Sequence, residues 1–518
     1  MCFCIECRFF VVSMSTLKKL FSETAIYGLS SIVGRLLSYL LTPLYTYNLI
    51  PSEYGVVTEM YAYVTFLGII LTYGMETAFF RFYTGESNKK SVFATSLVSL
   101  LSTSFLFLLL IWAFRIPLAT ILNGSGNPEM AAAYASYIVW FAWIVSIDAI
   151  TAIPFARLRA NNRPIRFAMI KLVNIFSYVF FNLFFILGIP YLKSHGYLTW
   201  LTGFFEQEKL VNFIFLSNLI SSSLTLFMLL PELRFSFKDF DQLLWNRMIK
   251  YAIPILIMGL AGMVNETFDR IMMKYLLPLP AEDIMHQIGV YGACYKLSII
   301  MSICVQAFRY AAEPFFFSRH QEGGGRKIYA QVMTYFVFGC CLVFLGTMLY
   351  MDAIKFFIGK TGSQFLEGLP VVPYLLMANL CLGVYYNLAI WFKLTDRPIY
   401  GSYMSIFGAI LTLFLNWIWI PQLGYLGASY TTLACYGAMM LISYAWGQKH
   451  FPIEYDLGKF FFMIGFALVL YALSLWLEPS DLVLKSSLNT VWILLFAGVT
   501  YFVIVKNYLK FIPFSKAE

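Results

Sequence analysis

The sequence predicts an all-α membrane protein of about 14 transmembrane helices, in two parallel six-helix lobes followed by two C-terminal helices. Three observations support this fold class. The 518 residues are 60% hydrophobic and only 12% charged, whereas a soluble protein carries about 25% charged residues. Apolar stretches long enough to cross a bilayer recur along the whole chain. Two sets of motifs also recur in the same order in both halves of the sequence.

Fourteen apolar stretches are separated by short polar, proline- or glycine-containing turns. Each is long enough to form a membrane-spanning helix. The expected helices are 24–50, 54–79, 91–114, 131–155, 165–189, 210–230, 251–277, 288–312, 328–350, 369–392, 399–420, 424–446, 457–477 and 486–505.

Basic residues are concentrated in alternate connections between these helices. With the adjoining helix ends included, the termini and the even-numbered connections hold 25 of the 36 Lys and Arg residues and the odd-numbered connections hold seven, and four lie deep within spans. Because positively charged loops stay in the cytoplasm, we expect both termini to be cytoplasmic. Within these connections the Lys and Arg residues stand singly or in small groups between apolar stretches. The +9 net charge therefore forms no continuous basic face, and we expect no nucleic-acid partner.

The extreme N-terminus contains three of the nine cysteines, Cys2, Cys4 and Cys7. No His or Cys partners follow at the spacing of a metal site, so no metal is expected. We interpret Met14 as the natural start and residues 1–13 as an upstream extension; the alternative is that the three cysteines belong to the native protein. The other cysteines lie in apolar runs, where Cys behaves as a small hydrophobic residue.

An internal repeat relates the two halves of the chain. The matching motifs are Arg163-Pro164-Ile165 with Arg397-Pro398-Ile399, Asn182 with Asn416, Pro51 with Pro278, and Tyr54-Gly55 with Tyr291-Gly292. An even number of helices separates the copies, so the two lobes have the same orientation, related by an axis along the membrane normal. The expected organisation is a cytoplasmic segment 1–23, an N-lobe 24–230 (helices 1–6), a C-lobe 251–446 (helices 7–12), helices 13 and 14 over 457–505, and a cytoplasmic tail 506–518.

The first helix and hairpin end in TPLYTYNLIPSEYG, residues 42–55. This segment resembles the first helix of bacterial polysaccharide exporters. From about Met14, the two lobes, the two extra helices and the basic inner loops are similar to the polysaccharide exporter, or lipid-linked oligosaccharide flippase, branch of the multidrug/oligosaccharidyl-lipid/polysaccharide flippase superfamily. The resemblance implies a V-shaped pair of lobes around a central cavity that alternates between inward and outward states. It also implies an undecaprenyl-diphosphate-linked oligosaccharide as substrate and the bacterial inner membrane as location.

Charged residues within the expected spans are the candidate site residues. The cations are Arg35, Lys171, Arg270 and Lys296, and the deep acids are Asp148, Glu266 and Asp269. A charge at membrane depth is costly, so these side chains should face the bundle interior or a wet cavity. We expect Arg35, Arg270 and Lys296 to line the cavity and bind the diphosphate, for which Arg supplies a planar fork of donors.

Structural roles are the alternatives for the same charges. Glu266 and Arg270 are four residues apart, a spacing that permits an ion pair on one helical face. Asp148 and Lys171 are expected to pair across the hairpin between helices 4 and 5. An ion pair or carbonyl contact is the structural alternative for Arg35.

The expected function is transport, not enzymatic catalysis. A cation-coupled multidrug exporter of the same superfamily is the alternative, although four deep cations against three acids disfavour a cavity for drug cations. A further alternative function is that of a polysaccharide polymerase or ligase. It is disfavoured because the longest expected external loop has only about 20 residues. The four histidines also form no catalytic arrangement. The expected partners are the lipid-linked oligosaccharide and membrane lipid, with other polysaccharide-assembly proteins as further candidates. No cofactor is expected; the driving ion is open between a proton and sodium.

Overall fold

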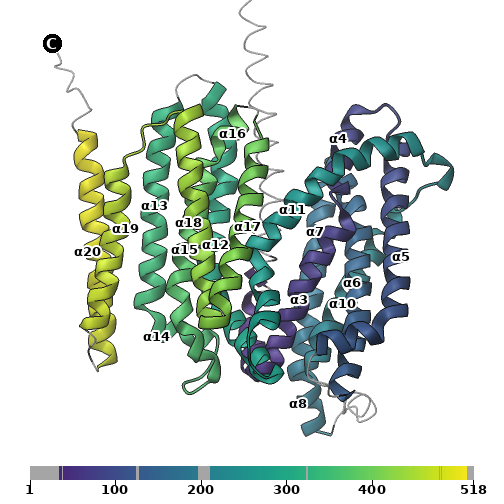
Figure 1. The fold of residues 1–518 in the computed structure, drawn as a ribbon, viewed down its shortest axis with the longest axis horizontal. Coiled ribbons are helices and arrows are strands. Elements are labelled where there is room, and N and C mark those ends of the chain that lie inside the picture. Colours follow the sequence, from purple (N-terminus) through teal and green to yellow (C-terminus); the bar gives the residue numbers. More distant parts are fainter. Residues whose placement is uncertain are drawn as a thin grey trace, which may run out of the picture. The chain divides into compact units, whose positions relative to one another are not determined.

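The computed structural model of this chain consists of helices joined by short connections (Figure 1). It describes residues 34, 36, 37, 39–123, 128–196, 210–321, 325–395, 397–477, 479 and 481–509. Over these ranges there is no β-strand, and 12 helices are long and apolar enough to cross a membrane. The prediction of an all-α, multi-pass membrane protein is therefore confirmed.

The helices of the first half begin with the short α2 (Thr42–Thr46) and continue with α3 (Pro51–Thr72), α4 (Met75–Gly85), α5 (Lys89–Asn123), α6 (Pro128–Ala160), α7 (Pro164–Leu183), a π-helical turn (Phe184–Gly188), α8 (Ile189–Ser194) and α10 (Leu210–Leu229). The second half comprises α11 (Gln242–Leu276), α12 (Ala281–Gln321), α13 (Gly325–Leu349), α14 (Met351–Ile354), α15 (Val372–Leu388), α16 (Ile390–Leu394), α17 (Ile399–Leu423), α18 (Tyr425–His450), α19 (Leu457–Trp476) and α20 (Leu482–Leu509).

The count of about 14 spans agrees with the structure. Twelve of the expected spans correspond to the 12 apolar helices. A further expected span, 424–446, corresponds to α18, which has 26 residues and is rich in Ser, Thr, Tyr and Gly. The remaining expected helix, 24–50, falls mostly outside the described residues.

Several helices are longer than the apolar stretches that predicted them. α11 begins at Gln242, not at residue 251, and α12 continues to Gln321. The 41 residues of α12 correspond to about 60 Å at 1.5 Å per residue, about twice the 30 Å hydrocarbon core of a bilayer. Hydropathy locates only the part of a helix that faces lipid, so it underestimates the length of helices that continue into water.

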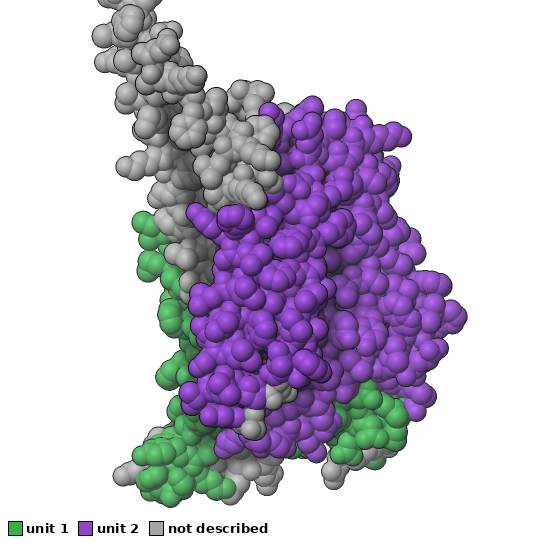
Figure 2. Space-filling view, turned by 90° about the vertical axis from the view of Figure 1, so that its left-hand side faces the viewer, with its two compact units in different colours: residues 1–263, 279–288 green, residues 264–278, 289–518 purple. Residues whose placement is uncertain are grey.

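The chain divides into two compact units (Figure 2). Unit 1 comprises Met1–Met263 and Leu279–Ile288, and unit 2 comprises Val264–Pro278 and Gly289–Glu518. Consequently α11 and α12 both begin in unit 1 and end in unit 2. Each unit has its own apolar core: Phe79 and Leu97 are fully buried in unit 1, and Trp391 and Cys435 are buried in unit 2.

The second expected span is interrupted at Tyr73-Gly74, between α3 and α4. Both residues have left-handed backbone, with φ of 33° and 72°. The Tyr73 hydroxyl hydrogen-bonds the Ser99 hydroxyl at 2.7 Å, and Trp245 Nε1 donates to the same oxygen at 2.7 Å. A Cβ atom on Gly74 would lie 2.8 Å from the carbonyl oxygen of Ala252. The break therefore requires glycine at position 74 for both its backbone conformation and its close approach to α11.

Replacing Gly74 is expected to destabilise the protein. Gly74→Val adds a branched side chain where φ is positive and the Ala252 carbonyl leaves no room, at a cost of about 1–3 kcal/mol. The measurement is thermal unfolding of the purified protein in mild detergent. Gly68→Ala on α3 is the matched control, because nothing lies within 4 Å of the added Cβ. Equal melting temperatures for Gly74→Val and wild type would contradict this account of the break.

A polar cluster anchors α20 within unit 2. The Asp352 carboxylate on α14 accepts a hydrogen bond from Lys355 Nζ at 2.7 Å and forms an ion pair with Lys485 on α20. The hydrogen bonds from these two lysines lower the pKa of Asp352 from its ordinary value, so the carboxylate stays ionised at neutral pH. Asn489 Nδ2 donates to the Leu349 carbonyl at 2.6 Å on the same side of α20.

Candidate functional site

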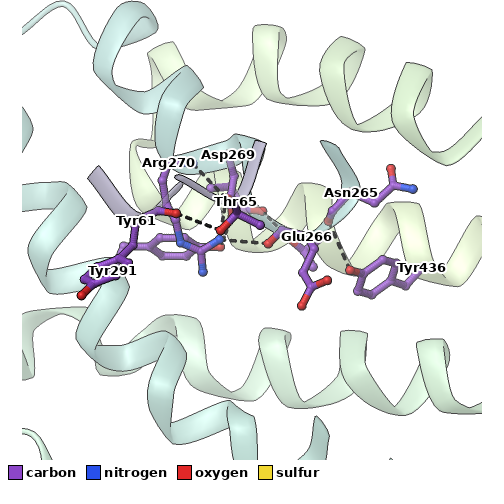
Figure 3. A network of polar contacts seen from close by, with 10 residues as sticks. Tyr61, Thr65, Asn265, Glu266, Asp269, Arg270, Tyr291 and Tyr436 are labelled. Carbon is purple, nitrogen blue, oxygen red and sulfur yellow. Dashed lines mark hydrogen bonds and ion pairs between the residues drawn. The ribbon is translucent and has the colours of Figure 1, made fainter. Parts of the chain in front are cut away.

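The ion pair between Arg270 and Asp269 is the most completely bonded charge pair at membrane depth in unit 2 (Figure 3). Both residues are on α11 and are buried, with 7% and 6% exposure. Arg270 Nη1 donates to Asp269 Oδ1 at 2.9 Å and to the carbonyl of Glu266 at 2.9 Å. Asp269 Oδ2 accepts the Tyr291 hydroxyl at 2.6 Å, and Oδ1 also accepts the backbone N–H of Arg270 at 2.9 Å.

This arrangement differs from the expected ion pair. Arg270 pairs with the carboxylate of its neighbour Asp269, while Glu266 contributes only its backbone carbonyl. The guanidinium also lies 4.3 Å from the ring centroid of Tyr295, a favourable cation–π geometry. A buried charge is tolerated when it is paired and hydrogen-bonded. These contacts make Arg270 part of the junction between α11 and α12. They do not support the expectation that Arg270 binds the diphosphate.

Asn265 forms a second polar junction on α11, which the sequence analysis did not single out. Its carbonyl accepts the Tyr436 hydroxyl at 3.2 Å, as Figure 3 shows. Its side-chain Oδ1 accepts the Thr412 hydroxyl at 3.2 Å, and its Nδ2 donates to the Ser405 carbonyl at 3.3 Å. These bonds join α11 to α17 and α18. An uncharged residue of this kind carries no distinctive sequence signal, since Asn is common in many other positions.

Lys296 on α12 is a cation within a span of unit 2 that has no ion-pair partner among the described residues. It is the sixteenth residue of the apolar helix Ala281–Tyr310, and is therefore near the middle of the span. Its side chain is half-buried. Over the described ranges, its ammonium group makes no hydrogen bond, ion pair or cation–π contact. An ammonium in this position requires a polar or anionic partner, because lipid cannot solvate it.

Glu266 on α11 is an acid within a span of unit 2. Its side chain is exposed, and among the described residues its carboxylate has no ion-pair or hydrogen-bond partner. Figure 3 shows this carboxylate directed away from the guanidinium of Arg270. An exposed carboxylate in a membrane-spanning helix must face a polar space, since exposure to hydrocarbon would be too costly.

Asp148 and Lys171 in unit 1 form no direct ion pair. Asp148 on α6 is exposed, and its Oδ1 accepts the Ser222 hydroxyl of α10 at 3.0 Å. Lys171 Nζ on α7 lies 4.3 Å from the ring centroid of Phe155, and no described carboxylate lies within 4 Å of it. Ser222 thus provides a hydrogen bond to the Asp148 carboxylate, and the Phe155 ring provides a cation–π contact to the Lys171 ammonium. The two charges still attract each other electrostatically, so the expected pair is present without a direct ion pair within 4 Å.

A hydrogen-bonded group of tyrosines and asparagines lies beside these charges in unit 1. The Tyr178 hydroxyl hydrogen-bonds the hydroxyls of Tyr45 at 3.0 Å and Tyr61 at 3.2 Å. Tyr45 donates to Asn182 Oδ1 at 2.9 Å, and Asn218 Nδ2 donates to the Tyr61 oxygen at 3.2 Å. These tyrosines join α2, α3, α7 and α10 through their hydroxyl groups. Tyr45 and Tyr178 therefore contribute to the contacts between helices.

The remaining candidate, Arg35, and the cysteines Cys2, Cys4 and Cys7 lie outside the described residues, so their roles stay predictions. No group of three or more His, Cys, Asp or Glu side chains that could hold a metal ion occurs in the part of the chain that the structure describes.

Twelve apolar helices in the described residues, with charged side chains within their spans, define a multi-pass helical membrane protein. Residues 20–320, more than half of the chain, match the family model described as polysaccharide biosynthesis protein. The chain therefore belongs to this family. A search of curated protein sequences gave no match.

Solved structures of transporters have the same fold. The lipid II flippase MurJ, in an inward closed conformation, is similar with a TM-score of 0.70 and 13% identity, over 94% of this chain and 99% of that chain. An outward-facing multidrug resistance MATE family transporter of the MOP superfamily is similar with a TM-score of 0.52 and 12% identity, over 83% of this chain and 95% of that chain. A MOP superfamily transporter from Pyrococcus furiosus is similar with a TM-score of 0.52 and 11% identity, over 83% of this chain and 95% of that chain. These identities establish the fold alone.

Proposed function

We propose that this protein is a flippase that moves an undecaprenyl-diphosphate-linked oligosaccharide, a precursor of surface polysaccharide, across the bacterial inner membrane by alternating access. Membership of the polysaccharide biosynthesis family and the fold shared with a lipid II flippase support the proposal. In this proposal both termini are cytoplasmic, because the basic residues are concentrated in the even-numbered connections. The protein changes the position of its substrate and forms or breaks no covalent bond in it.

The unpaired ammonium of Lys296 is the observation that carries the proposed substrate class. A diphosphate is a compact anion with several acceptor oxygens, and Lys is a strong point-charge partner for phosphate. Lys296 lies near the middle of its span and makes no hydrogen bond or ion pair within the described residues. Arg270, in contrast, is already neutralised by Asp269. We therefore assign the diphosphate contact to Lys296, with Arg35 as the second proposed cation.

A cation-coupled multidrug exporter is the second candidate function, and two observations favour it. Asp148 and Glu266 are exposed carboxylates within spans, and neither has an ion-pair partner among the described residues. Carboxylates of this kind attract organic cations or take up a coupling proton or sodium ion. The fold shared with MATE transporters is compatible with this function as well.

Transport of the two substrate classes by the same purified chain distinguishes the two functions. Full-length protein is reconstituted into vesicles that contain an undecaprenyl-diphosphate oligosaccharide, and the oligosaccharide that becomes accessible to an external glycosidase is measured over time. Parallel vesicles are tested for uptake of a fluorescent aromatic cation under proton and sodium gradients. We expect protein-dependent exposure of the oligosaccharide and no protein-dependent dye uptake. Dye uptake without movement of the oligosaccharide would refute the flippase and establish the exporter.

A further inference from the structure

An apolar crevice opens on unit 2. It lies among α13, α15, α18 and α19 and has a volume of about 130 Å³, smaller than the roughly 300–1,000 Å³ of sites for drug-sized molecules. Met333, Val384, Leu388, Met440, Phe460 and Met463 form much of its lining. Away from its surface end, the polar side chain of the lining is Thr334, whose hydroxyl is bonded to the Ala330 carbonyl at 3.1 Å, so the crevice does not suit a sugar or a phosphate.

The position of the crevice determines what can fill it. All four lining helices are membrane-spanning by length, and the crevice occurs where α13 and α19 begin and where α15 and α18 end. It therefore extends from one membrane surface toward the interior. An apolar space of this size at membrane depth gains nothing from water, whereas an acyl chain that enters it buries methylene groups at about 0.8 kcal/mol each.

Polar groups surround only the surface end of the crevice. Tyr444 and Tyr455 lie there with ring centroids 6.2 Å apart, and tyrosine is typical of the membrane–water interface. The Asp456 carboxylate is paired with Lys459 Nζ at 3.1 Å and accepts the Lys459 backbone N–H at 3.0 Å.

Positive charge exceeds negative charge at this end of the crevice. The cations on the adjoining helix ends are Arg326, Lys327, Lys449 and Lys459, and the acids are Glu454 and Asp456. Arg326 lies 4.7 Å from the ring centroid of Phe451, which brings its charge to the α18–α19 connection. An anionic headgroup would therefore be attracted to this surface, since each basic residue near a membrane surface contributes about 1 kcal/mol with anionic lipid.

We propose that the crevice is a binding site for a bilayer phospholipid with an anionic headgroup, which inserts one acyl chain between α13, α15, α18 and α19. The headgroup lies at the α18–α19 connection beside Lys449 and Arg326. The lipid comes from the leaflet on that side of the membrane and is a resident of the site. It is distinct from the translocated substrate, so the site does not depend on the proposed function.

Photo-crosslinking tests where the lipid binds. The full chain is reconstituted with phosphatidylglycerol that carries a diazirine near the end of one acyl chain, and crosslinked peptides are identified by mass spectrometry. We expect labels on peptides that contain Met333 of α13 and Met463 of α19. Labels restricted to lipid-facing residues elsewhere, such as Val469, would overturn the proposal.

Filling the crevice tests affinity. Ala330→Phe adds a ring to the lining, and Val469→Phe, on the exposed face of α19 outside the crevice, is the matched control. Native mass spectrometry should show phosphatidylglycerol retention about tenfold weaker for Ala330→Phe, and unchanged retention for the control. Equal retention by folded Ala330→Phe would refute the site. If Ala330→Phe does not fold, the wild-type crosslinks decide alone.

Lipid selectivity tests the headgroup assignment. The double variant Arg326→Gln/Lys449→Gln should lose the preference for phosphatidylglycerol over phosphatidylcholine while it still retains a phospholipid. An unchanged preference would refute the anionic headgroup. Displacement of phosphatidylglycerol by undecaprenyl phosphate at equal concentration would reassign the crevice to the substrate's own chain and overturn the proposal.

Discussion

Lys296→Met is expected to abolish translocation of the lipid-linked oligosaccharide without any loss of folded protein. The ammonium has no partner within the described residues, so methionine, with similar length and no charge, removes no stabilising contact. Loss of a buried charge partner costs about 2–5 kcal/mol of substrate binding, and 2 kcal/mol alone corresponds to about thirtyfold in affinity. Removal of an unsatisfied polar group is expected to raise the melting temperature slightly.

The measurement is the vesicle translocation assay together with thermal unfolding in mild detergent. Lys296→Arg keeps the positive charge and is expected to keep part of the activity. Lys355→Met is the matched lysine control: its ammonium is bonded to Asp352 on α14, far along the sequence from the proposed site, and translocation should persist. Full translocation by Lys296→Met would eliminate the proposed diphosphate contact. Low recovery of folded Lys296→Met would mean that the lysine stabilises the fold.

The pair Asp269–Arg270 is expected to show the opposite behaviour, in which each single substitution lowers the amount of folded protein. Asp269→Asn leaves the buried guanidinium without its counter-ion, and Arg270→Met leaves the buried carboxylate without its own. Removal of one partner of a buried pair typically costs about 3–5 kcal/mol. The double variant Asp269→Asn/Arg270→Met removes both charges together and should recover much of the loss.

A double-mutant cycle measures this coupling, with folded protein recovered after mild heating as the readout. Glu266→Gln is the control on the same helix, because the Glu266 carboxylate has no partner among the described residues and its removal should change stability little. Single variants that are recovered at wild-type level but do not translocate would show instead that Arg270 acts on the substrate.

The spans could be predicted from the sequence because the bilayer requires long apolar runs and because each backbone group must be bonded within its own helix. Even the less apolar α18 was predicted, since it lies between recognisable turns. The break at Tyr73-Gly74 could not be predicted in the same way. It depends on the approach of the Ala252 carbonyl, which is distant in sequence.

The charges were harder to assign because side-chain partners depend on neighbouring helices. The i, i+4 rule favoured Glu266 as the partner of Arg270, whereas the Tyr291 hydroxyl of α12 holds Asp269 in place to receive the guanidinium. In the same way, Ser222 of α10 binds the Asp148 carboxylate that the sequence analysis had paired with Lys171. Composition and depth identified the charges within the spans, but groups from helices distant in sequence, such as Tyr291 and Ser222, determine how those charges are bonded.

The two asparagines that the internal repeat matches, Asn182 and Asn416, have different surroundings. Asn182 accepts the Tyr45 hydroxyl at 2.9 Å and donates to the Tyr178 carbonyl at 2.7 Å. Its counterpart Asn416 is fully buried, yet neither atom of its amide group has a hydrogen-bond partner in the described chain. The same residue at matching positions of the repeat is therefore bonded in one half and not in the other, so the contacts of one half cannot be used to infer those of its counterpart.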